Sequence, residues 1–272
     1  MYLDYWQLTT QPFEAVTDRG ALYPCEAHEG ALSKLRYAIE NRRGAAALAG
    51  PAGVGKTMLV QMLRGSLGER WSPFVHVVFP QMSGPELLAY VAEQFGAPPA
   101  DAPRHTVDES IRRIEFVLRQ NADHGRHAVV AVDEAHLLED CGTLETLRLL
   151  LNFESAGRPT LTLLLVGQMG LIPALGRLPS LDERVSVKTL LRSLTAAETA
   201  AYVRHRLAAA GAQREPFTAD ALRALHELSH GIPRQINRLA DLALVVGFAE
   251  RLPQISAQDI EAVSDELVSL AA

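Results

Sequence analysis

The sequence predicts an α/β fold, in which helices cover both faces of a parallel sheet, followed by a small all-helical domain. Three observations predict this architecture. Short, continuously apolar runs alternate with helix-like segments over about the first 190 residues, a pattern typical of strands buried on both faces. Beyond this point only helical patterns follow. Glycine and proline breaks separate the segments, and no convincing internal repeat is present. We therefore expect domains at 1–193 and 194–272.

The elements of the first domain can be assigned in order. AAALAG and AVVAV are wholly apolar, and FVHVVF is rich in β-branched and aromatic residues, which favours strands. The expected strands are 45–50, 74–79, 128–132, 161–166 and 185–190. The expected helices are 56–67, 85–95, 107–121 and 144–153, with a loop at 96–106.

The second domain is predicted to contain four helices. Polar capping residues precede three of them, and glycines stand where two of them end, as expected at helix termini. The expected helices are 195–211, 218–229, 233–250 and 256–270. The capping residues are Thr195 with Glu198, Thr218, and Ser256 with Asp259, and the glycines are Gly211 and Gly231.

Composition excludes several classes of protein. Of the 272 residues, 48% are hydrophobic and 21% are charged, as in globular proteins, which excludes disorder, collagen and coiled coil. Cys25 and Cys141 are the two cysteines, too few for a zinc module or a disulfide framework. Asp4 stands where a signal peptide is basic and then apolar, and no segment is long and apolar enough to span a membrane. We therefore expect a cytoplasmic protein.

Charge is unevenly distributed along the chain. The net charge is −6, but the segment 188–238 carries +4, while 1–187 and 239–272 each carry −5. The overall balance disfavours a strongly basic nucleic-acid binder. Because the segment 188–238 is rich in arginine, a DNA partner remains an alternative.

A phosphate-binding loop follows the first expected strand. GPAGVGKT fits the pattern GxxxxGK[ST] between a strand and a helix. Its glycines let backbone N–H groups surround phosphate oxygens, and the helix N-terminus favours negative charge. Lys56 is expected to reach the β- and γ-phosphates, and Thr57 to ligate Mg²⁺. The expected nucleotide-binding residues here are Gly50, Pro51, Ala52, Gly53, Val54, Gly55, Lys56, Thr57 and Met58.

An acidic motif follows the strand 128–132, as in a Walker B site. Asp133 is expected to hold Mg²⁺ through water, and Glu134 to polarise the attacking water. DEAH also spells a helicase box, but such a helicase needs a second core domain, for which the chain has too few residues. His136 is expected to be a satisfied or solvated side chain rather than a metal ligand.

Two further polar residues are candidates for contact with the γ-phosphate. Gln168 follows the strand 161–166, where its amide could orient water; the alternative is a residue that caps a turn. Arg234 begins the third helix of the second domain, from which it could move onto the phosphates when that domain closes. Its alternative is an arginine on a helix surface.

An arginine before the last strand is a candidate for transition-state stabilisation. Arg184 could neutralise developing charge in a neighbouring subunit. The alternative is a surface arginine paired with Asp182 or Glu183. Arg177 is the next candidate for the same role.

These motifs, in this order, resemble the AAA+ ATPases of the ExeA or general secretion pathway protein A type. The resemblance covers nearly the whole chain and rests on MYLDYW, QPF, GPAGVGKT, VDEAHLL, LLLNFES, LLLVGQ and HGIPRQINRLADLAL. It implies a P-loop nucleoside-triphosphatase core with a helical lid, and ATP as the nucleotide. The implied roles are Walker A for Lys56 and Thr57, Walker B for Asp133 and Glu134, sensor 1 for Gln168, arginine finger for Arg184 and sensor 2 for Arg234.

The resemblance also gives the N-terminal arm a role. It implies that Pro12, Phe13, Leu22 and Tyr23 lie near the adenine, whereas taken alone these residues indicate a hydrophobic packing arm. One departure is Gln168, because sensor 1 is often a shorter residue. Longer members carry a membrane segment and a peptidoglycan-binding domain after the lid, and this chain stops at Ala272.

The prediction is an Mg²⁺-dependent ATPase whose nucleotide state drives assembly or remodelling of a partner complex. We expect a nucleotide-dependent homo-oligomer that binds ATP and ADP and acts on a protein of a secretion, pilus or envelope system. One alternative is an ATP-dependent DNA-binding helper of transposition. Another is a nucleotide-gated scaffold with little turnover.

Overall fold

The computed structural model describes residues 1–14, 23, 25–97 and 106–269, and the chain divides into two compact units. The sheet unit comprises Ala27–Gly50 and Lys56–Leu191, and the helical unit comprises Met1–Glu26, Pro51–Gly55 and Arg192–Ala272. This division places the change of unit two residues before the expected boundary, and it groups the N-terminal segment with the helices.

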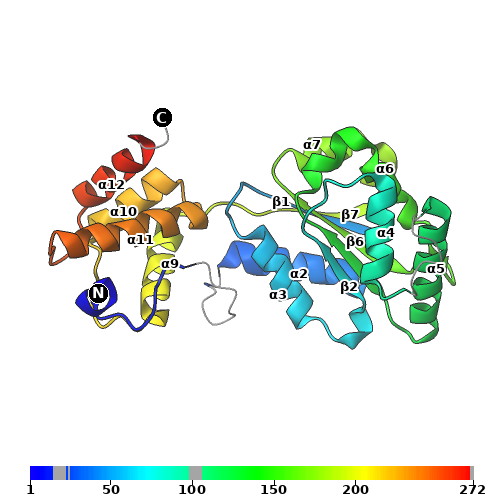
Figure 1. The fold of residues 1–272 in the computed structure, drawn as a ribbon, viewed down its shortest axis with the longest axis horizontal. Coiled ribbons are helices and arrows are strands. Elements are labelled where there is room, and N and C mark those ends of the chain that lie inside the picture. The colour runs from blue at the N-terminus through cyan, green and yellow to red at the C-terminus, as the bar shows by residue number, and fades with distance from the viewer. Residues whose placement is uncertain (15–22, 24, 98–105, 270–272) are drawn as a thin grey trace. The chain divides into compact units, whose positions relative to one another are not determined.

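The sheet unit is built on a five-stranded parallel sheet with the order β2-β3-β6-β1-β7 (Figure 1). Its strands are β1 Ala45–Ala49, β2 Phe74–Val77, β3 Ala128–Val132, β6 Leu161–Gly167 and β7 Val185–Leu190. Val130 pairs with Leu163, and Ala47 pairs with Leu165. The predicted parallel sheet is confirmed, and β6 lies between the strands that lead to the two phosphate-site motifs.

Helices lie on both sides of this sheet (Figure 1). Every residue of β1, β3 and β6 is buried, which matches their continuously apolar sequences. One face packs against α4 to α8, with Leu87, Ile114 and Leu147 in its core. The elements are α2 Glu26–Glu40, α3 Lys56–Ser66, α4 Gly84–Gln94, α5 Val107–Asp123, α6 Thr143–Leu150, α7 Leu171–Gly176 and α8 Pro179–Asp182, with 3-10 turns η2 Glu69–Trp71 and η3 Ala135–Cys141.

Some features of the sheet unit differ from the expectations. The strand expected at 74–79 ends at Val77, and the side chains of Val78 and Phe79 are exposed. Helix α2 and the short hairpin of β4 Glu154–Ser155 and β5 Arg158–Pro159 were not expected. Most of the loop expected at 96–106 lies outside the described residues.

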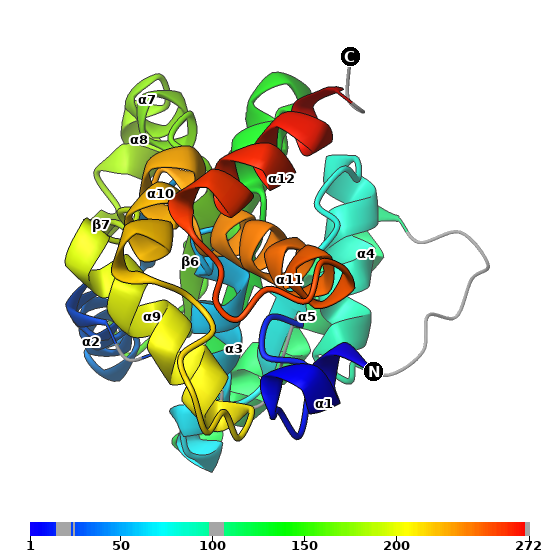
Figure 2. The same ribbon diagram turned by 90° about the vertical axis from the view of Figure 1, so that its left-hand side faces the viewer.

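The helical unit contains the four predicted helices (Figure 2). They are α9 Ala196–Ala209, α10 Ala219–Ser229, α11 Pro233–Ala249 and α12 Ala257–Ser269. Thr195 and Glu198 form a capping box, as predicted. Gly231 has a φ of 67°, and a Cβ there would clash with the carbonyl oxygen of Leu194. Only glycine therefore fits at this helix end.

The N-terminal segment is fixed onto these helices. Trp6, in α1 Tyr2–Trp6, is fully buried and donates through Nε1 to the carbonyl oxygen of Leu244 at 2.8 Å. The buried guanidinium of Arg206 donates to the carbonyl oxygens of Pro12 at 2.7 Å and Glu14 at 2.6 Å. Charge-assisted bonds of this kind are stronger than neutral ones, so Arg206 holds the segment firmly. Within the described ranges, no helix is long and apolar enough to cross a membrane.

Candidate functional site

The predicted phosphate loop joins the end of β1 to the start of α3. The N–H of Gly50 donates to the carbonyl oxygen of Gly167 at 3.2 Å, which ties the loop to the end of β6. A Cβ on Gly50 would lie 2.5 Å from the carbonyl oxygen of Leu191. Gly53 and Gly55 have φ values of 82° and 101°, which favour glycine. The backbone path of the loop therefore requires the glycines of the motif.

Lys56 begins α3 and points its charge inward. Its side chain is buried, and Nζ donates to the carbonyl oxygen of Gly50 at 3.0 Å. A buried ammonium needs strong polar partners, and a phosphate group at the loop would supply one. The position therefore suits an anionic ligand.

Asp133, at the end of β3, lies against the first turn of α3. Its carboxylate accepts from the Thr57 hydroxyl at 2.6 Å and from the N–H of Glu134 at 2.9 Å. Burial opposes its ionisation, but interactions with His76, Thr57 and Glu134 outweigh burial and hold the pKa of Asp133 below its usual value. An ionised carboxylate beside a hydroxyl fits Mg²⁺, which prefers oxygen ligands.

His76 is a residue of this site that the sequence did not reveal. It lies on β2 in register with Ala131 of β3. Its buried Nε2 lies 3.6 Å from Oδ2 of Asp133 and makes no hydrogen bond within the described residues. Such neighbours orient the carboxylates that hold metals.

His76→Ala is expected to weaken Mg²⁺-dependent nucleotide binding by about tenfold, because residues behind a metal ligand typically contribute at least this much to metal affinity. His76→Gln, which keeps a donor at the same distance along the side chain, should bind more tightly than His76→Ala. Fluorescent nucleotide titrations at several Mg²⁺ concentrations measure both. Equal affinities for His76→Ala and the unmodified chain would contradict this role.

Glu134 and Gln168 are connected through His136. Oε2 of Glu134 lies 3.4 Å from Nδ1 of His136, and the N–H of Gln168 donates to the same nitrogen at 3.3 Å. A Cβ on Gly167 would lie 3.2 Å from this ring, so the strand end allows close approach. The ends of β3 and β6 thus meet at a histidine whose contribution was not visible from the sequence. The side chain of Gln168 itself is exposed.

Arg184 lies where the strands of the sheet begin, at the end opposite the phosphate loop. Its carbonyl oxygen accepts from the N–H of Ala45 at 3.1 Å, whereas Gly50 follows the other end of β1. At about 3.3 Å per strand residue, the two ends of β1 are roughly 16 Å apart. The structure therefore does not bring Arg184 to the phosphate loop of its own chain.

The alternative for Arg184, a surface arginine paired with Asp182 or Glu183, is not observed. Asp182 pairs with Lys188 at 2.5 Å instead, and no ion pair to Arg184 occurs in the part of the chain that the structure describes. Arg177, the second candidate, is exposed at the end of α7.

Arg234 lies in the first turn of α11, in the helical unit. Its N–H donates to the carbonyl oxygen of Gly53 at 3.3 Å, and a Cβ on Gly53 would lie 2.8 Å from the Cβ of Arg234. Both residues belong to the same unit. The structure thus brings this predicted residue to the loop segment Pro51–Gly55, with its side chain exposed.

The residues expected near the adenine make packing contacts in the helical unit. Phe13 is buried, with its ring centroid 6.3 Å from that of Phe217. The ring of Tyr23 packs edge-on against Tyr202 at 6.0 Å. Leu22 lies outside the described residues. These contacts are those of a hydrophobic packing arm, and proximity to a base stays a prediction.

Sequence comparison relates the chain to known proteins. A family described as AAA domain matches residues 39–175. General secretion pathway protein A of Aeromonas hydrophila is 35% identical over 274 residues, which cover 98% of this chain and 48% of that protein. The chain therefore spans about half the length of this relative.

Solved structures share the fold at low sequence identity. The ORC2 protein of Aeropyrum pernix, in ADPNP–ADP complexes, is 17% identical over 92% of this chain and 71% of that one, with a TM-score of 0.66. Drosophila ORC bound to DNA is 15% identical, with 95% and 64% covered and a TM-score of 0.69. The RuvB branch migration motor of Thermotoga maritima is 18% identical, with 94% and 73% covered and a TM-score of 0.61.

Proposed function

Because the chain belongs to the AAA domain family, we propose that it binds ATP with Mg²⁺, hydrolyses it, and uses its nucleotide state to assemble or remodel a partner complex. The observation that carries this proposal is the hydrogen bond of 2.6 Å between the Thr57 hydroxyl and the Asp133 carboxylate. It joins the phosphate loop to the acidic strand end beside a buried Lys56. ATP hydrolysis is consistent with work in the cytoplasm, where this nucleotide is available.

The residues of the chain divide the chemistry among them. Backbone N–H groups of the loop and Lys56 would bind the phosphates, and Thr57 and, through water, Asp133 would hold Mg²⁺, which would supply positive charge to stabilise the reacting phosphates. Glu134 accepts hydrogen bonds from the attacking water and increases its nucleophilicity. The amide of Gln168, at the end of the adjacent strand β6, orients that water or contacts the γ-phosphate.

Lys56→Ala tests the nucleotide site directly. Loss of the ammonium should weaken ATP binding by at least tenfold, since hydrogen bonds to charged groups contribute roughly 1.5–3 kcal/mol. Isothermal titration calorimetry measures the affinity, and Lys34→Ala, an exposed lysine on α2, is the matched control. The unmodified chain should also release phosphate from ATP only when Mg²⁺ is present. Unchanged affinity in Lys56→Ala would refute the proposed site.

We propose further that the active form is a homo-oligomer in which Arg184 completes the site of a neighbouring subunit. Two observations support this. Arg184 is remote from its own phosphate loop, and β7, which follows it, is an edge strand of the sheet. A guanidinium supplied by a neighbour would stabilise negative charge on the transferred phosphoryl group.

Mixing two inactive variants should restore hydrolysis. Arg184→Ala lacks the proposed finger and Glu134→Gln lacks the proposed base, so a mixed interface contains one complete site. Phosphate release should rise above that of either variant alone as the mixing ratio is varied. Arg177→Ala in place of Arg184→Ala is the control, since rescue only with that variant would move the role to Arg177. No rescue at any ratio with either arginine would remove the in-trans finger.

For the partner, we favour a protein of a secretion or envelope system over DNA. The identity to general secretion pathway protein A supports the first. The basic charge of the segment 188–238 is the reason to consider DNA. Most cations of this segment, however, already form ion pairs or hydrogen bonds with other groups of the chain. Four are in ion pairs, namely Lys188, Arg192, Arg204 and Arg223, and two donate to backbone carbonyls, namely Arg206 and Arg214. ATP-dependent binding of duplex DNA that weakens steeply with salt would reverse this order.

A further inference from the structure

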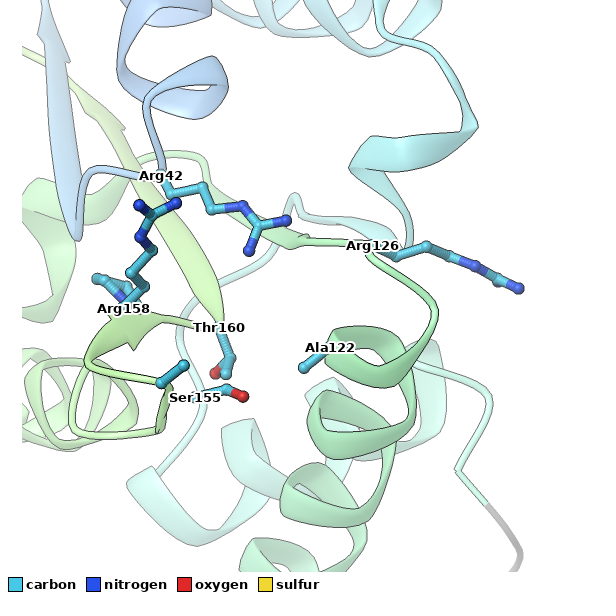
Figure 3. A pocket seen from close by; sticks show the side chains of 8 residues that line it. Arg42, Ala122, Arg126, Ser155, Arg158 and Thr160 are labelled. Carbon is cyan, nitrogen blue, oxygen red and sulfur yellow. The ribbon is translucent and has the colours of Figure 1, made fainter.

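The sheet unit contains a pocket at the end of the strands opposite the phosphate loop (Figure 3). Its volume is about 390 Å³, within the range of small-molecule sites. Arg42 precedes β1, Arg126 precedes β3 and Thr160 precedes β6, so the pocket lies at the amino ends of three neighbouring strands. Ser155 and Arg158, from the β4–β5 hairpin, complete one wall. Among the residues proposed to take part in ATP hydrolysis, only Arg184 lies at this end of the strands.

The pocket is strongly cationic. Burial, and then the like charges of Arg70 and Arg158, lower the pKa of Arg42. Glu154 and Asp123 are nearby in the sequence and exposed. Over the described ranges, no carboxylate forms an ion pair with Arg42, Arg126 or Arg158. The positive charges of Arg42 and Arg158 therefore lie at this concave surface without an ion-pair partner among the described residues.

The backbone holds two of these residues in place. Arg42 follows α2 with a φ of 50°, the left-handed conformation in which helices commonly end. Its guanidinium donates to the carbonyl oxygen of Gly125 at 3.2 Å. The hairpin turn, with positive φ at Ala156 and Gly157, is of the tight two-residue kind and positions Arg158.

Figure 3 shows how the side chains lie. Arg42 extends over the pocket and Arg158 lies beside it, while Arg126 points outward from the rim. The hydroxyl of Thr160 donates to the carbonyl oxygen of Phe153 at 2.7 Å and keeps a lone pair as acceptor. Ser155 adds a second hydroxyl to the wall.

We propose that this pocket binds a small phosphorylated ligand, with Arg42 and Arg158 donating to its phosphate oxygens and the Ser155 hydroxyl as a further donor. The planar fork of a guanidinium matches phosphate in a bidentate manner. A concave surface of this size accommodates a small molecule, whereas a nucleic-acid duplex requires an extended basic stripe. The ligand would sit on a different surface from the ATP bound at Lys56.

The test uses inorganic pyrophosphate and the full chain carrying Lys56→Ala, so that binding at the phosphate loop is weakened. Calorimetry should detect saturable binding that weakens with added salt. Adding Arg42→Ala with Arg158→Ala should raise the Kd at least tenfold, and Arg158→Ala alone should raise it measurably without disturbing α2. The matched control is Arg112→Ala with Arg119→Ala, two exposed arginines of α5, which should leave the Kd unchanged.

Three outcomes would overturn the proposal: no saturable binding to the Lys56→Ala chain, the same affinity after loss of Arg42 and Arg158, or an equal loss in the α5 control. Binding of duplex DNA or of vesicles rich in anionic lipid that depends on Arg42 and Arg158, without pyrophosphate binding, would also overturn it and assign the surface to a polymer or a membrane. ATP hydrolysis by Arg158→Ala, on the β4–β5 hairpin, should be unchanged in the otherwise unmodified chain, which separates this test from the proposed function.

Discussion

Glu134→Gln is expected to bind ATP with nearly unchanged affinity and to lower kcat by about 10²- to 10³-fold. Proton transfer by a positioned carboxylate contributes roughly this factor to a reaction. The amide of glutamine keeps the size of the side chain but loses the negative charge that polarises water. The backbone at this position, with a φ of 49° and its N–H bonded to Asp133, does not depend on the carboxylate. Binding is measured by calorimetry and turnover by phosphate release.

A matched substitution separates this effect from a general loss of charge. Glu145→Gln removes a half-exposed carboxylate on α6 that pairs with Arg148, and it should leave turnover unchanged. If Glu134→Gln turned over ATP at the normal rate, Glu134 would lose its role, and the nucleotide-gated scaffold would also be excluded. If the unmodified chain bound ATP without turnover, the scaffold would replace the ATPase.

The stability of the sheet unit is expected to fall as the pH is lowered from about 7 to 4.5, because of His127. This residue is fully buried, and its Nε2 lies 2.8 Å from the hydroxyl of Thr162. That hydroxyl donates to the carbonyl oxygen of Arg43 at 2.7 Å, so it accepts from Nε2–H, and the proton of the neutral ring sits on Nε2. Burial, with smaller contributions from Arg42 and Arg70, lowers the pKa of His127 to about 3.

The direction of the effect follows from proton binding in the two states. Between about pH 6.5, the pKa of an unfolded histidine, and about pH 3, the unfolded chain binds a proton that the folded chain does not. The contribution is therefore complete above about pH 6.5 and is lost progressively toward pH 3. Between pH 7 and pH 4.5 it amounts to roughly 2–3 kcal/mol.

Urea denaturation across this range measures the free energy of unfolding. His127→Gln should reduce the pH dependence by about this amount, while His124→Gln, which removes an exposed histidine of the same segment, should leave it unchanged. A slope that is the same for His127→Gln and the unmodified chain would show that His127 titrates normally in the folded protein.

The fold was largely predictable because its elements depend on local patterns. The apolar runs of β1, β3 and β6 and the capping box at Thr195 are encoded within a few residues each. The end of β2 was less predictable, since the apolar pattern continues through Val78 and Phe79. Strand β2 ends at Val77 because its partner β3 ends at Val132. The sequence of β2 alone does not reveal how long its partner is.

The site was predictable only where its chemistry follows a fixed spacing. Lys56, Thr57, Asp133 and Glu134 stand in motifs, and the structure places Thr57 against Asp133. His76 is far from these motifs in the chain, and only the register of β2 with β3 brings it to Asp133. The pocket lined by Arg42 and Arg158 likewise consists of residues from three separate strand ends and from the β4–β5 hairpin, which no local sequence pattern predicted.

The separation of Arg184 from the phosphate loop limits how copies of the chain can associate. If one end of the strands donates a finger and the other end accepts one, each contact uses two different patches of the surface. A pair related by a twofold axis would bring like patches together and leave the sites incomplete. Copies must instead add head to tail, with a constant rotation that either closes into a ring or continues as a helical filament. In any open assembly, one terminal copy would keep a site without its arginine and the other would carry an unused arginine, so activity per subunit would rise with assembly length.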